Sequence, residues 1–300
     1  MSLGIPAEPS ALLNAVLIGD SCAIVPLLPS QFANAIITSP PYFGHRQYAD
    51  ESLAESEIGR EASLAEYVGR LAGLFRELKR VLRDDGTLWL VLGDTYREGQ
   101  LLGVPWRVAF ALQEDGWLLR SEIIWHKPNA MPSSVKNRPT VAHETIFLFA
   151  KQANYFYNAD AIREPHVTFT EESRMMGGRK HFGKPNGTPE NGKNRGNPNL
   201  HRARWDQAFH PLGRNKRTVW SIPLGKFREA HFAVFPPELV EVCLLASTPE
   251  QGIVLDPFMG SGTTGVVAKR LNRNFLGIEL VPHYAEMALR RIGEISTPLF

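Results

Sequence analysis

The chain is 300 residues long with 43% hydrophobic and 21% charged residues, a composition that predicts a globular protein with a substantial core and excludes disorder throughout. It contains no apolar run of the roughly eighteen residues that a transmembrane helix requires and no N-terminal export signal, so we expect a cytoplasmic protein without membrane association. Its two cysteines, Cys22 and Cys243, lack zinc-ligand spacing, which excludes a disulfide framework and predicts no bound metal, and its net charge of +2 is unevenly distributed.

Strand and helix patterns alternate from the N-terminus onward. Apolar runs at 15–19 and 34–38 predict strands, 64–82 has apolar residues at helical spacing, and 87–92 predicts a strand after a turn at Asp85 and Gly86. A helical pattern at 101–113 is followed by strand patterns at 117–125 and 145–149. Continuously apolar strands alternating with helices predict an α/β fold with a mainly parallel sheet covered on both faces.

A basic segment interrupts this alternation. Residues 174–228 carry 13 Lys and Arg against two acidic residues, whereas the rest of the chain has 20 basic and 29 acidic residues. Such a concentration of positive charge predicts a surface that binds nucleic acid. Residues 177–199 are too rich in Gly, Pro and Asn to build a core, and they predict a basic loop that contacts phosphates. The candidate DNA-binding residues are Lys180, Lys184, Lys193, Arg195, Arg202, Arg204, Arg214, Lys216 and Arg217.

After the basic segment, the pattern predicts a helix at 236–246, strands at 252–255 and 275–278, and helices at 263–271 and 282–292. The segment 253–265, IVLDPFMGSGTTG, predicts a buried strand ending in Asp256, a glycine loop and a helix that begins near Thr263, an arrangement typical of a ligand site. Glu279 follows the next strand, where a carboxylate can accept hydrogen bonds from a ribose. These features predict an adenosine-type cofactor, either a nicotinamide dinucleotide or an adenosine sulfonium.

The segment Thr38-Ser39-Pro40-Pro41-Tyr42 follows a predicted strand and indicates the reaction. If the Ser39 hydroxyl and the Pro40 carbonyl accept the two hydrogens of a nucleobase amino group, the nitrogen becomes pyramidal and its lone pair can attack an electrophilic methyl group. Pro41 restricts the direction of that carbonyl, and Tyr42 would stack on the base. In duplex DNA the base must first leave the stack, at a cost of a few kcal/mol.

These motifs resemble those of the S-adenosylmethionine-dependent DNA methyltransferases that modify the amino group of cytosine or adenine. Ser39 to Tyr42 match the family's catalytic tetrapeptide, Asp/Asn/Ser-Pro-Pro-Tyr/Phe/Trp, and 258–262 match its cofactor loop, Phe-x-Gly-x-Gly. The catalytic motif precedes the cofactor loop, an order typical of the circularly permuted beta group. The resemblance covers nearly the whole chain and implies a Rossmann-like methyltransferase fold with a small basic target-recognition insertion.

The resemblance also implies roles for residues around S-adenosylmethionine. Asp256 would lie near the methionine amino group, Glu279 would hold the ribose hydroxyls, and Asp20 would contact the adenine amino group. Phe258 would pack against the cofactor, and 231–247 would border its methionine end. The candidate cofactor-binding residues are thus Asp20, Phe235, Pro236, Asp256, Phe258, Gly260, Gly262, Thr263 and Glu279.

By the same resemblance, we expect a catalytic half at 1–165, a target-recognition region at 166–228 and a cofactor-binding half at 229–300. The implied partners are double-stranded DNA, a second copy in a homodimer and a cognate restriction endonuclease. The implied location is the cytoplasm of a bacterium, an archaeon or a phage-infected cell, at the nucleoid.

The target base is less strongly indicated than the reaction. Serine at the first catalytic position favours cytosine N4 in this family, with adenine N6 as the alternative. Cytosine C5 is disfavoured because neither cysteine lies in a Pro-Cys context. A protein glutamine methyltransferase remains a distant alternative, since it has the two motifs in the opposite order. A nicotinamide oxidoreductase lacks a recognisable hydride-transfer group here, and a non-catalytic DNA-binding protein would not need Ser39 to Tyr42.

Overall fold

The computed structural model describes residues 8–44, 51–166, 210, 212–225 and 236–295. The chain divides into a larger unit, 1–157 with 218–300, and a smaller unit, 158–217. The predicted catalytic and cofactor halves therefore fall almost entirely within the larger unit.

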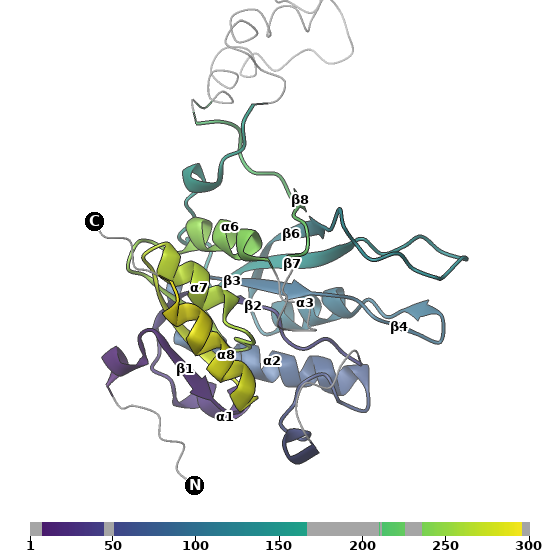
Figure 1. The fold of residues 1–300 in the computed structure, drawn as a ribbon, viewed down its shortest axis with the longest axis horizontal. Helices are drawn as coiled ribbons and strands as arrows, with labels where there is room; N and C mark the ends of the chain where they lie inside the picture. Colours follow the sequence, from purple (N-terminus) through teal and green to yellow (C-terminus); the bar gives the residue numbers. More distant parts are fainter. Residues whose placement is uncertain (1–7, 45–50, 167–209, 211, 226–235, 296–300) are drawn as a thin grey trace, which may run out of the picture. The chain divides into compact units, whose positions relative to one another are not determined.

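The larger unit is built on an eight-stranded sheet with the strand order β1-β10-β9-β2-β3-β7-β6-β8 (Figure 1). The first five strands in this order are mutually parallel, β7 is antiparallel to β3 and β6, and β8 is parallel to β6. The expected mainly parallel α/β sheet is thus confirmed. The strands are β1 (Ala15–Ile18), β2 (Ala33–Thr38), β3 (Leu82–Leu92), β6 (Leu118–His126), β7 (His143–Ala150), β8 (Val219–Ser221), β9 (Ile253–Asp256) and β10 (Asn274–Glu279), with a separate pair, β4 (Tyr96–Arg97) and β5 (Gln100–Leu101).

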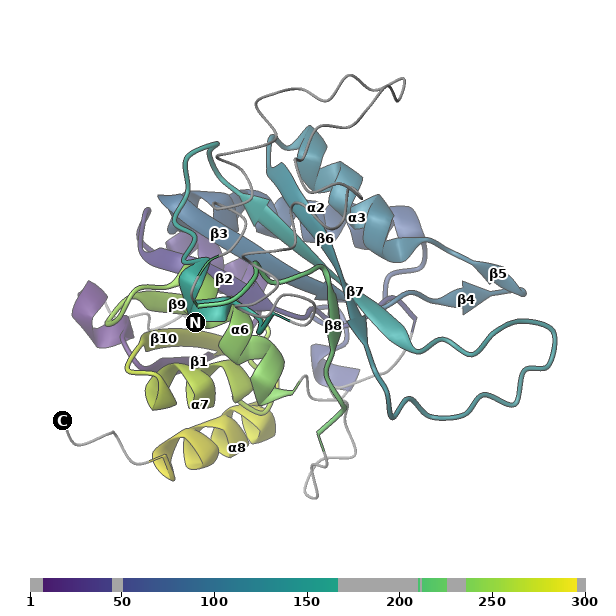
Figure 2. The ribbon, with the colours of Figure 1, turned by 90° about the horizontal axis from the view of Figure 1, so that it is seen from above.

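Helices cover both faces of this sheet. Helices α2 (Leu64–Val81) and α3 (Val104–Glu114) lie on one face, and α6 (Pro237–Ser247), α7 (Thr263–Arg270) and α8 (Pro282–Gly293) lie on the other (Figure 2). A short helix, α1 (Ser21–Ile24), follows β1. Short 3-10 helices occur at Pro9–Leu12, Val25–Leu27, Glu51–Leu53 and Asp160–Ile162.

The sequence explains both the start of α2 and the face that it buries. The Ser63 hydroxyl accepts from the Glu66 amide and the Glu66 carboxylate accepts from the Ser63 amide, both at 3.2 Å, which forms a capping box. From there the apolar residues at helical spacing are buried against the sheet, among them Tyr67, Leu71 and Phe75. The predicted helix at 64–82 is confirmed.

The turn predicted at Asp85 and Gly86 is wrong. Strand β3 runs through these residues, and its register with β2 shifts between Ala33 and Ala35. A Cβ on Gly86 would lie 2.6 Å from the Leu82 side chain and 2.8 Å from the Asn34 carbonyl oxygen. Gly86 therefore permits a close approach at a strand irregularity instead of making a turn.

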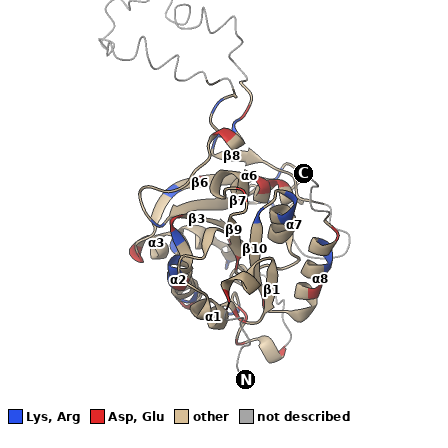
Figure 3. Cartoon of the chain, turned by 90° about the vertical axis from the view of Figure 1, so that its left-hand side faces the viewer, with Lys and Arg blue, Asp and Glu red and all other residues tan. Residues whose placement is uncertain are grey.

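Charge and burial follow the layers. Charged residues lie mainly on the helices and connections, while the central strands carry few of them (Figure 3). Strands β2, β3 and β7 are buried along most of their length because helices cover both faces of the sheet. Within the described ranges, no helix has both the length and the hydropathy required to cross a bilayer.

In the smaller unit, a backbone bridge joins Glu164 to Arg214. A Cβ on Gly213, whose φ is +110°, would lie 2.2 Å from the Glu164 carbonyl oxygen, so this crossing requires glycine. The Glu164 carboxylate also forms ion pairs with Arg214 at 3.2 Å and with Lys216 at 3.5 Å.

Candidate active site

One edge of the sheet collects the predicted chemical groups. Strands β1, β10, β9 and β2 are parallel neighbours, so their carboxyl ends lie along the same edge. In that spatial order, these ends carry Asp20, Glu279, Asp256 and Ser39. The catalytic tetrapeptide and the glycine loop, more than two hundred residues apart in the chain, are thus brought to adjacent strands.

Asp256 connects the two motifs directly. One of its carboxylate oxygens accepts from the Thr38 hydroxyl at 2.7 Å and from the Phe258 amide at 3.1 Å, and the other accepts from the Thr264 hydroxyl at 2.6 Å. The side chain is fully buried, and this desolvation raises the pKa of Asp256 to about 6 although the hydrogen bonds oppose the shift. Asp256 therefore links Thr38, the residue before Ser39, to Thr264 in the first turn of α7.

The glycine loop combines an open position with a packed one. Gly260 has φ +53° and, among the described residues, its added Cβ would meet only the Phe258 carbonyl oxygen, 4.0 Å away, which leaves space above the loop in this part of the structure. A Cβ on Gly262, at φ +84°, would lie 2.7 Å from the Ala288 Cβ, so this glycine permits the loop to pack on α8. Arg291 of α8 donates to the carbonyl oxygen and the hydroxyl of Ser261.

The polar groups around this loop fit an adenosine-type cofactor. The Glu279 carboxylate accepts from the Gly260 amide at 2.7 Å and from the Val281 amide at 2.9 Å, and burial raises its pKa. The backbone amide of Leu280 also interacts with this carboxylate, and the lone-pair capacity that remains can accept a ribose hydroxyl. The Thr263 hydroxyl at the start of α7 is buried and has no hydrogen-bond partner among the described residues. The open space at Gly260 and these unused bonding capacities suit a polar ligand on the loop.

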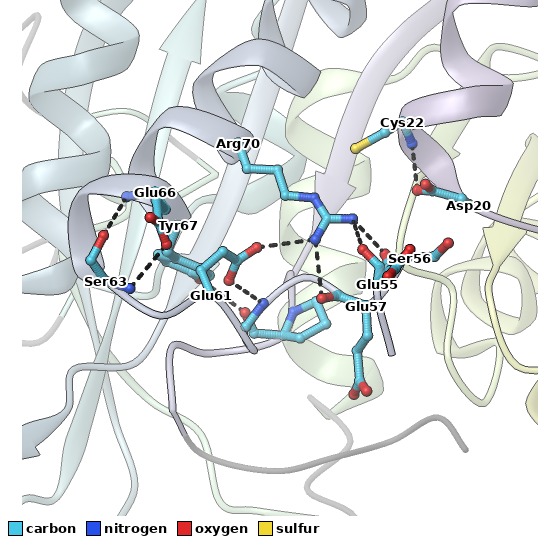
Figure 4. A network of polar contacts seen from close by, with 12 residues as sticks. Asp20, Cys22, Glu55, Ser56, Glu57, Glu61, Ser63, Glu66, Tyr67 and Arg70 are labelled. Carbon is cyan, nitrogen blue, oxygen red and sulfur yellow. Dashed lines mark hydrogen bonds and ion pairs between the residues drawn. The ribbon is translucent and has the colours of Figure 1, made fainter. Parts of the chain in front are cut away.

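A loop held by α2 borders the β1 end of this edge. The guanidinium of Arg70 donates to the carbonyl oxygens of Glu55, Ser56 and Glu57 at 2.8–3.2 Å and forms an ion pair with Glu61 at 3.3 Å. Figure 4 shows Arg70 facing this segment, with Asp20 and Cys22 nearby. The Asp20 carboxylate accepts from the Cys22 amide at 2.8 Å and so caps α1. These contacts hold the loop that contains residues 55–61 in place beside Asp20.

The catalytic tetrapeptide is supported from two sides. The Tyr67 hydroxyl of α2 donates to the Pro41 carbonyl oxygen at 2.9 Å. On the other side, a Cβ on Gly93, directly after β3, would lie only 2.5 Å from the Tyr42 ring. Ser39 and Tyr42 are partly exposed, and Pro40 is buried. Glycine at position 93 therefore leaves the space that the Tyr42 ring occupies.

Two functional candidates were missed by the sequence interpretation, namely Glu144 at the start of β7 and Lys127 after β6. The Tyr42 hydroxyl donates to a Glu144 carboxylate oxygen at 2.8 Å, and the other oxygen accepts from Lys127. Lys127 also lies over the Trp125 ring, 4.5 Å from its centroid. The segment 125–128 carries a weak signal, an aromatic residue and a cation at a strand end. The pairing of Trp125 with Glu144 brings Lys127 to this carboxylate, and the pairing of β7 with β3 brings Glu144 toward Tyr42.

The remaining candidate residues are described only in part. Pro236 precedes the first turn of α6, and Arg214 and Lys216 pair with Glu164 in the smaller unit. Arg217 is described, and its contact with DNA stays a prediction. The remaining candidates lie outside the described residues: Lys180, Lys184, Lys193, Arg195, Arg202, Arg204 and Phe235.

Fold and site together define a class: a Rossmann-like α/β enzyme with a nucleotide-type cofactor loop next to a rigid reaction centre. Comparison with known proteins gives the family. Residues 33–290 match the DNA methylase family of the N6/N4 type. The chain is 39% identical to the type II methyltransferase M.Cfr9I of Citrobacter freundii over 95% of this chain and 90% of that protein. It is 38% identical to M.SmaI of Serratia marcescens, covering 92% and 90% of the two chains.

Solved structures agree with the fold. The cytosine-N4-specific PvuII DNA methyltransferase has a TM-score of 0.66 with 20% identity, over 94% of this chain and 88% of that chain. A DNA modification methylase from Thermus thermophilus, solved in complex with S-adenosyl-L-methionine, has a TM-score of 0.56 with 25% identity, over 93% and 94%. The chain belongs to the S-adenosylmethionine-dependent DNA methyltransferases that modify exocyclic amino groups of bases.

Proposed function

We propose that this protein transfers the methyl group of S-adenosylmethionine to the N4 amino group of a cytosine that is flipped out of a specific duplex DNA site. Ser39 and Pro40 accept the amino hydrogens, Pro41 and Tyr42 shape the base pocket, and the glycine loop with Asp20 and Glu279 holds the cofactor. Phe235, Pro236, Phe258 and Thr263 complete the cofactor pocket in this proposal.

The observation that carries this proposal is the hydrogen bond of 2.7 Å between Thr38 and Asp256. It joins the residue before Ser39 to the carboxylate that begins the cofactor loop. A methyl donor on that loop would be next to an amino group held at Ser39, as direct transfer between two bound reactants requires. Neither reactant needs activation by a metal ion or by a covalent enzyme intermediate, because the sulfonium is already an electrophile.

Cytosine N4 is favoured over adenine N6 by the family preference for serine at the first position of the tetrapeptide. A hydroxyl accepts more weakly than a carboxylate, and adenine N6 remains the alternative. The test is to incubate unmethylated DNA with the enzyme and isotopically labelled S-adenosylmethionine and to separate its nucleosides by mass spectrometry. We expect labelled N4-methylcytosine; labelled N6-methyladenine alone would establish the alternative, and an unlabelled digest would refute DNA methylation altogether.

The proposed partner is double-stranded DNA, recognised through the basic segment that begins near Arg174. A homodimer and a cognate restriction endonuclease stay predictions from the family resemblance, as does a location at the nucleoid in the cytoplasm. Direct sequencing of modified bases in DNA from cells expressing the protein reports the methylated base and its surrounding sequence together.

A further inference from the structure

We propose that Glu144, acting through Tyr42, makes Ser39 the proton acceptor for the target amino group. The inference rests on the proposed function and deepens it, because it adds a positioning residue from β7 that the catalytic tetrapeptide does not contain. Three consecutive contacts carry it: Ser39 to Tyr42, Tyr42 to Glu144, and Glu144 to Lys127.

The direction of this hydrogen-bond chain follows from its charged end. A carboxylate can only accept, so the Tyr42 hydroxyl donates to Glu144, at 2.8 Å. The Tyr42 oxygen is then available as an acceptor, and the Ser39 hydroxyl donates to it at 3.3 Å. With its own hydrogen committed to Tyr42, the Ser39 oxygen presents lone pairs elsewhere. A serine hydroxyl, which could otherwise donate or accept, becomes an acceptor for the amino group.

The environment preserves this direction. Burial raises the pKa of Tyr42 well above its usual value, and the charge of Glu144 raises it further, so the tyrosine keeps its proton. Lys127 forms an ion pair with the second oxygen of Glu144, and the two side chains are only 13% and 16% exposed. A partly buried pair of this kind fixes the carboxylate with its other oxygen toward Tyr42.

The chain also gives the departing proton a route. The lone pair of the amino nitrogen forms the new N–C bond while the electron pair of the C–S bond remains on sulfur, which thereby loses its positive charge. The nitrogen then releases one proton to the Ser39 oxygen, the Ser39 proton moves to Tyr42, and the Tyr42 proton moves to Glu144. One methyl group and one proton have been transferred, and Glu144 returns the proton to solvent before the next turnover.

Single-turnover transfer of labelled methyl groups to an unmethylated duplex that contains the sequence recognised by the enzyme tests this chain. We expect Y42F, which keeps the ring but removes the hydroxyl, and E144Q, which removes the charge, each to slow transfer by about 10²-fold. The dissociation constants for DNA and S-adenosylmethionine should change less than about twofold, and E144D should recover part of the rate. E122Q, in the middle of β6, is the matched control and should transfer at the wild-type rate.

The double variant provides the sharpest measurement. If Tyr42 and Glu144 act as one chain, Y42F/E144Q is no slower than the slower single variant. Rate losses that multiply in the double variant would overturn the inference, as would a wild-type rate in Y42F. Thermal unfolding identifies an E144Q protein that fails to fold, in which case Y42F alone decides. Absence of methyl transfer by the wild-type enzyme would instead refute the proposed function.

Discussion

Asp256 connects the two motifs of the site through its hydrogen bonds, and its ionisation affects the stability of the protein. It is fully buried, it accepts from Thr38 and Thr264, and burial raises its pKa to about 6. A carboxyl group whose folded-state pKa is raised stabilises the protein most when it is protonated. That contribution is complete below the unfolded-state value of 3.8 and is lost as the pH rises through about 6.

We therefore expect the stability of the wild-type protein to fall relative to D256N as the pH rises. The difference between the two pKa values corresponds to a loss of roughly 2 kcal/mol between pH 4 and pH 7. Urea unfolding of both proteins across this range measures the difference, and the asparagine variant removes the titration while keeping a side chain of similar shape. A stability difference that stays constant or increases with pH would contradict the assignment.

At this scale, the sequence was informative where a residue's neighbours are local. Asp256 and Glu279 could be predicted because each ends a recognisable strand, and Gly260 because its loop lies between a strand and a helix. Glu144 could not be predicted, since its partner Tyr42 is 102 residues away and the contact depends on the register of β7 with β3. Nothing in the local sequence of 143–150 specifies that register.

At the scale of elements, glycines show where helices must approach closely. Gly262 precedes α7 at φ +84°, and its Cβ would lie 2.8 Å from the Cα of Ala288 in α8. An added Cβ on Gly73, on α2, would meet no atom within 4 Å among the described residues, apart from those of the adjoining helix turns. The two positions therefore predict opposite effects of the same substitution.

We expect G262A to destabilise the protein by roughly 3 kcal/mol, because it combines a backbone clash with a left-handed conformation. G73A should be neutral or should stabilise the protein by up to about 1 kcal/mol, because alanine is the better helix former. Urea denaturation of both variants against the wild type tests the pair. Equal stabilities for the two variants would show that the packing of α7 on α8 is not as described.

The loop at 51–61 depends on α2 through Arg70. Its guanidinium donates to three carbonyl oxygens of this loop, and these bonds are lost without it. In R70M we expect faster amide hydrogen exchange in 51–61 and weaker binding of S-adenosylmethionine, since this loop borders Asp20. R76M is the control, because Arg76 is 65% exposed and pairs only at the surface with Asp115. An unchanged rate of amide hydrogen exchange in R70M would show that Arg70 does not hold this loop in place.

The elements themselves followed from hydrophobic periodicity, with differences at their ends. The helix predicted from Leu101 begins at Val104, because Gly103 at φ +68° is its N-cap and Pro105 lies in its first turn. Strand β8, with three residues, is too short to show a period. It is recognisable only by its pairing with β6.

At the scale of the whole molecule, the distribution of charge predicts how DNA binding responds to salt. Thirteen basic residues lie between 174 and 228, and each phosphate contact contributes about −0.9 to the slope of log K against log salt concentration. Replacing four of them by glutamine should therefore make the slope shallower by about 3–4. The residues to replace are Lys180, Lys184, Lys193 and Arg195.

Filter binding between about 50 and 200 mM salt, read with the single-turnover rate at saturating DNA, measures this effect. The rate should change little, because these lysines and arginines are not among the groups placed at the reaction centre. The matched control has the same number of glutamine replacements outside the basic segment, at Arg76, Arg83, Arg270 and Arg290. This variant should keep the wild-type slope. If the slope of log K against log salt concentration became shallower by the same amount in both variants, the basic segment would contribute no more to DNA binding than other basic residues do.

The order of the strands has a last consequence for how the polypeptide is assembled. Strands β9 and β10, from the end of the chain, are inserted between β1 and β2, from its beginning. The portion up to residue 166 thus has a gap in its ladder that only the portion after 236 can fill. Cutting the enzyme between these portions would yield complementary fragments, each unable to complete its backbone hydrogen bonding until the two have recombined.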